Sequence, residues 1–80
     1  MDTKEKNKLA EENKHISTEE MKQDIADTQA EIIVMEREIK GFRLIGDRWS
    51  MMRADSRESG IGKRKEFIEK LEAILEVRQN

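Results

Sequence analysis

The chain has 80 residues, a net charge of −2, 42% charged and 4% aromatic residues, and neither cysteine nor proline. This length allows one domain with a small core, and the absence of cysteine together with the single histidine, His15, excludes disulfides and thiolate or zinc sites. No apolar run approaches the roughly 18 residues of a membrane span, and the first residues lack the apolar stretch of a secretory signal, so we expect a cytoplasmic protein with no membrane contact and no cofactor.

The first fifteen residues are poor in apolar side chains. Leu9 is the only large apolar residue there besides Met1. Such a segment cannot bury enough surface to offset the entropy lost on ordering it. We predict a disordered or frayed N-terminal arm over residues 1–15, with an extension of the following helix as the alternative.

A helix start follows the arm. Ser17 can accept a backbone N–H as an N-cap, and Glu20, three residues later, completes a capping box. Ile16 and Met21 occupy the two positions of a hydrophobic staple. The pattern predicts a helix that begins at Ser17.

The next 25 residues carry a heptad stripe. Its members alternate at spacings of four and three: Met21, Ile25, Thr28, Ile32, Met35, Ile39 and Phe42. This spacing is typical of helices that wrap around each other in a coiled coil. Ile33 and Val34 widen the apolar face and indicate contact with a second neighbour.

Two glycine-containing segments are candidates for the turn of a helical hairpin within residues 16–80. We prefer a turn at about 58–62, which joins a helix over about 17–57 to one over about 62–79. The alternative is a turn at Gly46-Asp47, which would leave Gly60 and Gly62 inside a helix at a cost of roughly 2 kcal/mol. The preferred arrangement leaves the first half of the long helix without a partner. The sequence therefore predicts an all-α, long helical hairpin or coiled coil that self-associates.

One face of the last helix combines apolar residues with arginine. Its members are Ile61, Arg64, Phe67, Ile68, Leu71, Ile74, Leu75 and Arg78. The amphipathic spacing indicates a helix packed against another helix.

Charge is unevenly distributed along the chain. Residues 1–38 carry a net charge of −5, residues 39–65 carry +5 and residues 66–80 carry −2. Within the basic block, the segment from Gly60 to Arg64 resembles part of a phosphate-binding loop, but the first glycine and the Ser or Thr of the full pattern are absent. The candidate anion-binding residues are Arg53, Arg57, Gly60, Gly62, Lys63, Arg64 and Lys65. We prefer a basic turn between helices as the interpretation of Gly60 to Arg64.

The candidate oligomer or partner face consists mainly of the heptad stripe. Its members are Ile25, Ile32, Ile33, Met35, Ile39, Phe42, Trp49 and Met52. Trp49 and Met52 continue the phase set by Phe42, and we prefer a core position for both over a partner-binding patch.

No group of residues predicts catalysis. We therefore expect a small non-enzymatic interaction protein, such as an adaptor, assembly factor or inhibitor, that binds another protein, itself or both. Small chains without distinctive motifs are common among phage and bacterial accessory proteins. The alternative is a small nucleic-acid or nucleotide binder that uses the basic segment 40–65.

Overall fold

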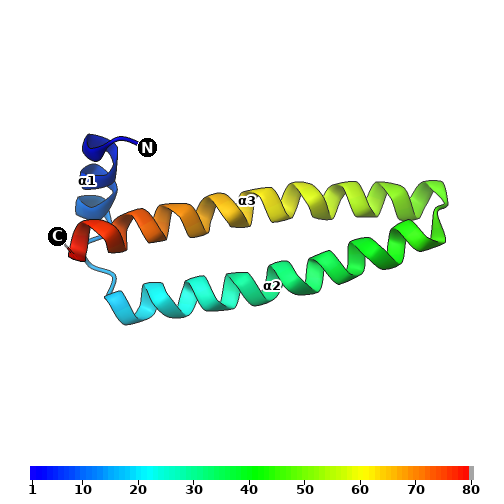
Figure 1. The fold of residues 1–80 in the computed structure, drawn as a ribbon, viewed down its shortest axis with the longest axis horizontal. Coiled ribbons are helices and arrows are strands. Elements are labelled where there is room, and N and C mark those ends of the chain that lie inside the picture. Colours follow the sequence, from blue (N-terminus) through cyan, green and yellow to red (C-terminus); the bar gives the residue numbers. More distant parts are fainter. Residues whose placement is uncertain (80) are drawn as a thin grey trace.

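The computed structural model describes residues 1–79 and is built from helices alone over that range. The helices are α1 (Thr3–Glu12), α2 (Thr18–Ile45) and α3 (Arg48–Gln79). α2 and α3 lie side by side as an antiparallel hairpin, and α1 lies across the C-terminal end of α3 (Figure 1). The whole forms a rod of 49 × 23 × 17 Å. The predicted all-α helical hairpin is confirmed.

The start of α2 matches the prediction from its capping signals. The hydroxyl of Ser17 accepts a hydrogen bond from the backbone N–H of Glu20 at 3.1 Å. Ile16 and Met21, the two staple residues, belong to one apolar cluster. Local sequence therefore fixes this end of the helix.

The heptad stripe of α2 forms the core with α3. Met21, Thr28, Ile32 and Ile39 are buried. The remaining members are partly buried and pack against the core residues of the two helices: Ile25, Met35 and Phe42. The stripe is thus covered within the chain, which removes the reason for which the sequence predicted self-association.

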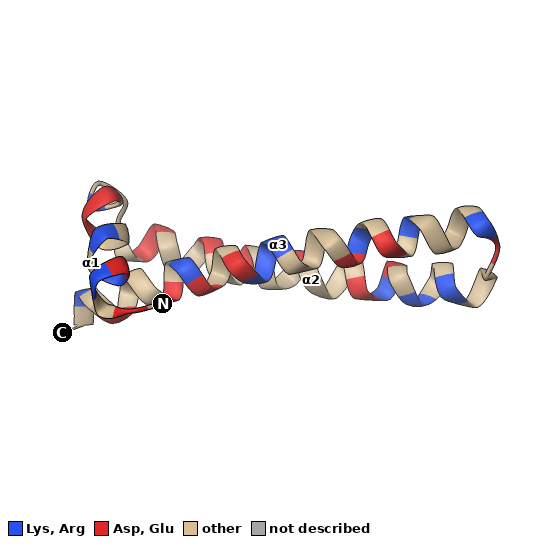
Figure 2. Cartoon of the chain, turned by 90° about the horizontal axis from the view of Figure 1, so that it is seen from above, with Lys and Arg blue, Asp and Glu red and all other residues tan. Residues whose placement is uncertain are grey.

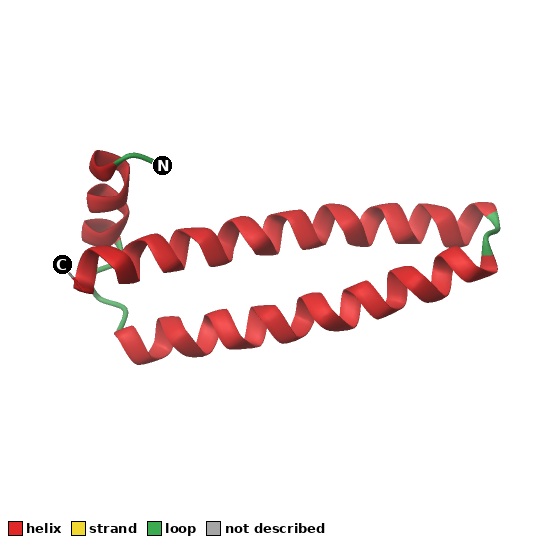
Figure 3. Ribbon diagram, viewed as in Figure 1, coloured by secondary structure: helices red, strands yellow, loops and turns green. Residues whose placement is uncertain are grey.

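The chain reverses at Gly46 and Asp47, so the preferred turn at 58–62 and the helix over 17–57 are wrong and the alternative turn is correct (Figure 3). Gly46 has a left-handed backbone with φ of 73°, which glycine adopts without strain, and its N–H donates to the carbonyl of Phe42 at 3.0 Å. The carboxylate of Asp47 then accepts the N–H of Ser50 at 2.7 Å, as an N-cap does.

Gly60 serves close packing between α2 and α3. A Cβ atom at this position would lie 2.8 Å from Cε of Met35, so the glycine makes room for that side chain. The carbonyl of Gly60 accepts a hydrogen bond from the Arg64 guanidinium at 3.2 Å. Gly62, by contrast, has open space where a Cβ would be. The glycines of this segment therefore do not mark a turn.

The predicted disordered arm is also wrong, because residues 3–12 form α1. Leu9 and Ala10 pack on a cluster that contains Ile74, whose side chain is only 1% exposed. Nζ of Lys6 pairs with Glu76 at 2.9 Å. The small apolar surface of this segment is sufficient because Leu9 and Ala10 cover an apolar cluster at this end of the rod.

The side chain of Arg78 fastens the link between α1 and α2 to the end of α3. Its guanidinium donates to the Thr18 hydroxyl at 3.1 Å. It also donates to the carbonyls of Asn13 at 3.2 Å and Ile16 at 2.6 Å. One side chain thus satisfies two carbonyls outside the helices and holds three segments together.

Replacing the two α3 glycines separately tests the position of the turn. Gly62→Ala should stabilise the protein by about 0.5–1 kcal/mol, because alanine has the better helix propensity and meets no neighbour. Gly60→Ala should gain less, since Met35 must move. Chemical denaturation of both variants measures the difference. A larger gain from Gly60→Ala would contradict the close approach of the helices.

The contact of α1 with the hairpin can be tested through Leu9. Leu9→Ala should destabilise the protein by about 1–2 kcal/mol, because the side chain is half-buried over Ile74. Deleting residues 1–12 should lower the melting temperature further, as measured by circular dichroism. The control, Lys4→Ala, changes an exposed side chain and should have little effect. Equal melting of the deletion variant and the parent would show that α1 does not pack.

Candidate functional site

The structure divides the predicted partner face into buried and exposed parts. Ile32 and Ile39 are buried, and Ile25, Met35 and Phe42 pack against the same core. These five side chains contribute to the hairpin itself. Ile33, Trp49 and Met52 are exposed.

The preference for Trp49 and Met52 as core residues is wrong. Trp49 is 73% exposed and Met52 is 55% exposed. The reason is the reversal at Gly46, beyond which the phase of α2 no longer applies. α3 sets its own phase, with the buried residues Ser50 and Ala54 facing α2.

Exposed apolar side chains gather at the end of the hairpin. Leu44 is 88% exposed and Ile45 is 66% exposed at the end of α2. Five large apolar residues within nine positions form what we call the apolar tip: Leu44, Ile45, Trp49, Met51 and Met52. Leu44 and Ile45 are absent from the predicted partner face, as is Met51, although their grouping around Gly46-Asp47 is visible in the sequence.

Basic residues surround the apolar tip. We call Lys40, Arg43, Arg48 and Arg53 the basic collar, and Asp47 is the only acidic residue between positions 40 and 53. Blue segments on both helices around a single red one show this arrangement at the turn (Figure 2). Arg43 pairs with Glu58, and the Arg53 guanidinium lies 6.0 Å from the centre of the Phe42 ring.

The candidate anion-binding residues do not meet at a turn. Gly60, Gly62, Lys63 and Lys65 lie in the middle of α3, where backbone N–H groups bond within the helix. Nε of Arg64 bonds Glu31 at 2.8 Å.

Arg57 is also engaged within the hairpin. Its Nε bonds Glu38 at 3.0 Å, and its guanidinium lies 4.8 Å from the centre of the Phe42 ring. Two of the five cations predicted for a phosphate site, Arg57 and Arg64, are therefore paired within the chain. Of the predicted anion-binding residues, only Arg53 belongs to the collar.

A second exposed apolar area lies halfway along α2. Ala30, Ile33 and Val34 form this mid-rod patch, and Ile33 and Val34 are 53% and 54% exposed. A groove of about 360 Å³ borders Ile33 and reaches Ile32 and Ile68. Another groove of about 410 Å³ borders Ala30 and Val34 and reaches Met35. The patch is therefore a low ridge beside two grooves.

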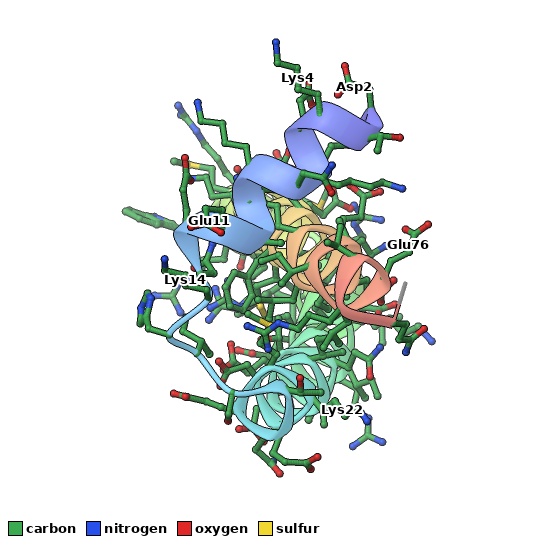
Figure 4. All side chains as sticks on the ribbon, turned by 90° about the vertical axis from the view of Figure 1, so that its left-hand side faces the viewer. Asp2, Lys4, Glu11, Lys14, Lys22 and Glu76 are labelled. Atoms are coloured by element: carbon green, nitrogen blue, oxygen red, sulfur yellow. The ribbon has the colours of Figure 1, made fainter. Side chains whose placement is uncertain are left out.

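The opposite end of the rod is polar. Figure 4 looks at this end and shows charged side chains pointing outward, among them Lys4, Glu11 and Glu76. Within residues 1–79, no three His, Cys, Asp or Glu side chains are grouped as metal ligands. None of the helices in that range is long and apolar enough to cross a membrane.

The charge of the Asp47 carboxylate contributes to the stability of the fold at the turn. The backbone N–H and hydroxyl of Ser50 donate to its carboxylate and hold its pKa below the ordinary value of 3.8. The N–H of Trp49 and the charge of Arg53 act in the same direction, while desolvation opposes them. Because the folded state lowers this pKa, the carboxylate stabilises the fold above about pH 3.8, and this is lost as pH falls through the lower folded pKa.

Asp47→Ala tests the cap and its charge together. The variant should melt at a lower temperature than the parent at about pH 7, and the difference should shrink as the pH is lowered below 3.8 and the parent's carboxylate takes up a proton. The control is Asp55→Ala, which removes an exposed carboxylate within α3 and should not lower the melting temperature. A difference between Asp47→Ala and the parent that does not change with pH would contradict a role for the charge.

Comparison of the chain with protein-family models, with curated proteins and with solved structures finds no match. The function is therefore inferred from the residues of this chain alone. Two surfaces stand out on the rod, namely the apolar tip with its basic collar and the mid-rod patch.

Proposed function

We propose that this chain is a small non-enzymatic interaction protein that binds another protein, or a second copy of itself, through the mid-rod patch. The single observation behind this proposal is the exposure of Ile33 and Val34 side by side in the middle of α2. Large apolar side chains that are exposed together on a soluble helix commonly mark contact surfaces.

The shape of the patch suits a helix from the partner. Ala26 and Ala30 are exposed and lie four residues apart on α2, and Ile33 follows three residues later. Residues at such spacings share one face of a helix, and small side chains among them let a second helix come close. The grooves beside Ile33 and Val34 would receive the side chains of that helix.

The alternative of nucleic-acid binding receives less support. Arg57 and Arg64 are paired with Glu38 and Glu31. The basic residues outside the basic collar are spread along the helices and do not gather into a strip of positive charge (Figure 2). Nucleic-acid binding depends on such charge.

Light scattering on the full chain at micromolar concentration, followed by affinity capture from a source lysate, tests the proposal. The double variant Ile33→Asp/Val34→Asp should lose self-association or the captured protein, because an aspartate cannot be buried unpaired in an apolar interface. The matched control is Phe67→Asp, which changes an exposed apolar residue of α3 and should retain binding. Nuclease treatment should not affect the capture.

The opposite pattern would contradict the proposal. Binding that persists in the double variant, or that disappears equally in Phe67→Asp, would show that the mid-rod patch is not the contact surface. Loss of the captured protein on nuclease treatment would favour the nucleic-acid alternative instead.

A further inference from the structure

The apolar tip points in several directions at once. Neighbouring residues of a helix project roughly 100° apart, so Leu44 and Ile45 face different sides of α2. Met51 and Met52 likewise face different sides of α3 and are both exposed. A protein surface that packs on one side of a hairpin covers only part of such a set. An occupant that covers all the side chains of the apolar tip must therefore surround the end of the hairpin.

The charge around the tip indicates an anionic occupant. The four cations of the basic collar and Asp47 give residues 40–53 a net charge of +3, and Glu58 pairs with one of these cations, Arg43. Among residues 1–79, neither Lys40 nor Arg48 takes part in an ion pair. These two cations are available to anionic groups outside the chain.

The spacing between the collar and the tip matches a lipid interface. Lys40 lies four residues before Leu44, and Arg53 lies four residues after Trp49, which is about 6 Å along a helix. Peripheral segments bury their apolar side chains about 5–10 Å into the boundary between head groups and acyl chains. Tryptophan is enriched at that depth, and basic residues near it contact lipid phosphates.

We propose that the apolar tip docks on the surface of a lipid bilayer that contains anionic lipids. Leu44, Ile45 and Trp49 enter the upper acyl region, and Lys40 and Arg48 contact the phosphates. A fluid bilayer encloses a convex tip from all sides. Only the turn enters the lipid, so docking needs no spanning helix. This surface is separate from the mid-rod patch, and the proposal departs from the expectation of no membrane contact.

The remaining charges set the depth and orientation of docking. The carboxylate of Asp47 lies in the turn itself, and its cost in hydrocarbon limits the depth of the apolar tip to the top of the acyl region. Residues 1–38 carry a net charge of −5, and the far end of the rod is therefore repelled by an anionic surface. The rod should stand on its tip.

Trp49 reports on this docking directly, because it is the only tryptophan of the chain and belongs to the tip. The full chain is titrated with vesicles of phosphatidylcholine alone and of phosphatidylcholine with phosphatidylglycerol. Trp49 emission should shift to shorter wavelength with the anionic vesicles, and lipids brominated near the top of the acyl chain should quench it. Salt at about 1 M, where the screening length is about 3 Å, should weaken binding.

Variants separate the apolar and basic parts. Leu44→Ser/Ile45→Ser should lower the affinity for anionic vesicles at least about tenfold. Its control, Phe67→Ser, removes an exposed apolar side chain of α3 that lies outside both surfaces and should bind like the parent. Lys40→Gln/Arg48→Gln should also lose roughly tenfold, whereas Lys63→Gln/Lys65→Gln should lose far less. Circular dichroism confirms that each variant folds.

The same measurements can overturn the proposal. An unchanged Trp49 spectrum with anionic vesicles excludes the bilayer and leaves an enclosing protein socket as the occupant of the tip. Equal affinity for neutral and anionic vesicles excludes the role of the collar, and equal losses in tip and control variants exclude the tip. None of these three results bears on the mid-rod patch, whose residues are unchanged in every variant.

Discussion

The left-handed backbone of Gly46 and the carboxylate of Asp47 reverse the chain within two residues, and this reversal sets which residues of α2 meet which residues of α3. Glu38 lies eight positions before Gly46, and its partner Arg57 lies eleven after it. Glu31 lies fifteen before, and Arg64 lies eighteen after. The same difference of three at both pairs shows one register over this part of the rod, which a turn at 58–62 could not produce.

The packed face of α3 carries arginine at positions where apolar residues are common. Arg57, Arg64 and Arg78 alternate there with small and apolar residues at spacings of three and four. Their aliphatic stems cover the edge of the core while their guanidinium groups bond residues elsewhere in the fold. Exposed ion pairs contribute only about 0–1 kcal/mol each. We therefore expect these arginines to reinforce the register that the turn sets more than they add to the stability.

The contrast between α2 and α3 explains how much of the fold the sequence predicts. The capping residues and large apolar side chains of α2 give its start and its buried face directly. The first half of α3 has the same periodicity, but small or charged residues occupy the face toward α2 there, namely Ser50, Ala54 and Arg57. A pattern based on large apolar residues therefore does not detect it. Gly60 then suggests a turn, whereas its contact with Met35 exists only once the two helices are paired.

The candidate surfaces were less predictable than the core, since exposure depends on the reversal. Ile33 and Val34 follow from their position beside the heptad stripe. Trp49 was assigned to the wrong environment because the phase of α2 was continued across Gly46. The role of α1 could not be read from residues 1–15 alone, because the surface that Leu9 covers belongs to the far end of the chain.

The sequence separation of the partners in contact along the rod also predicts an order of folding. The separation in sequence between bonded partners is 15 residues for Arg43 and Glu58, 33 for Arg64 and Glu31, and 70 for Lys6 and Glu76. Each doubling of a loop adds about 0.6 kcal/mol of closure entropy, so the pairs nearest the turn form at the lowest entropic cost. The hairpin should zip from Gly46 outward and α1 should dock last, so the end that carries the termini is also the first to open.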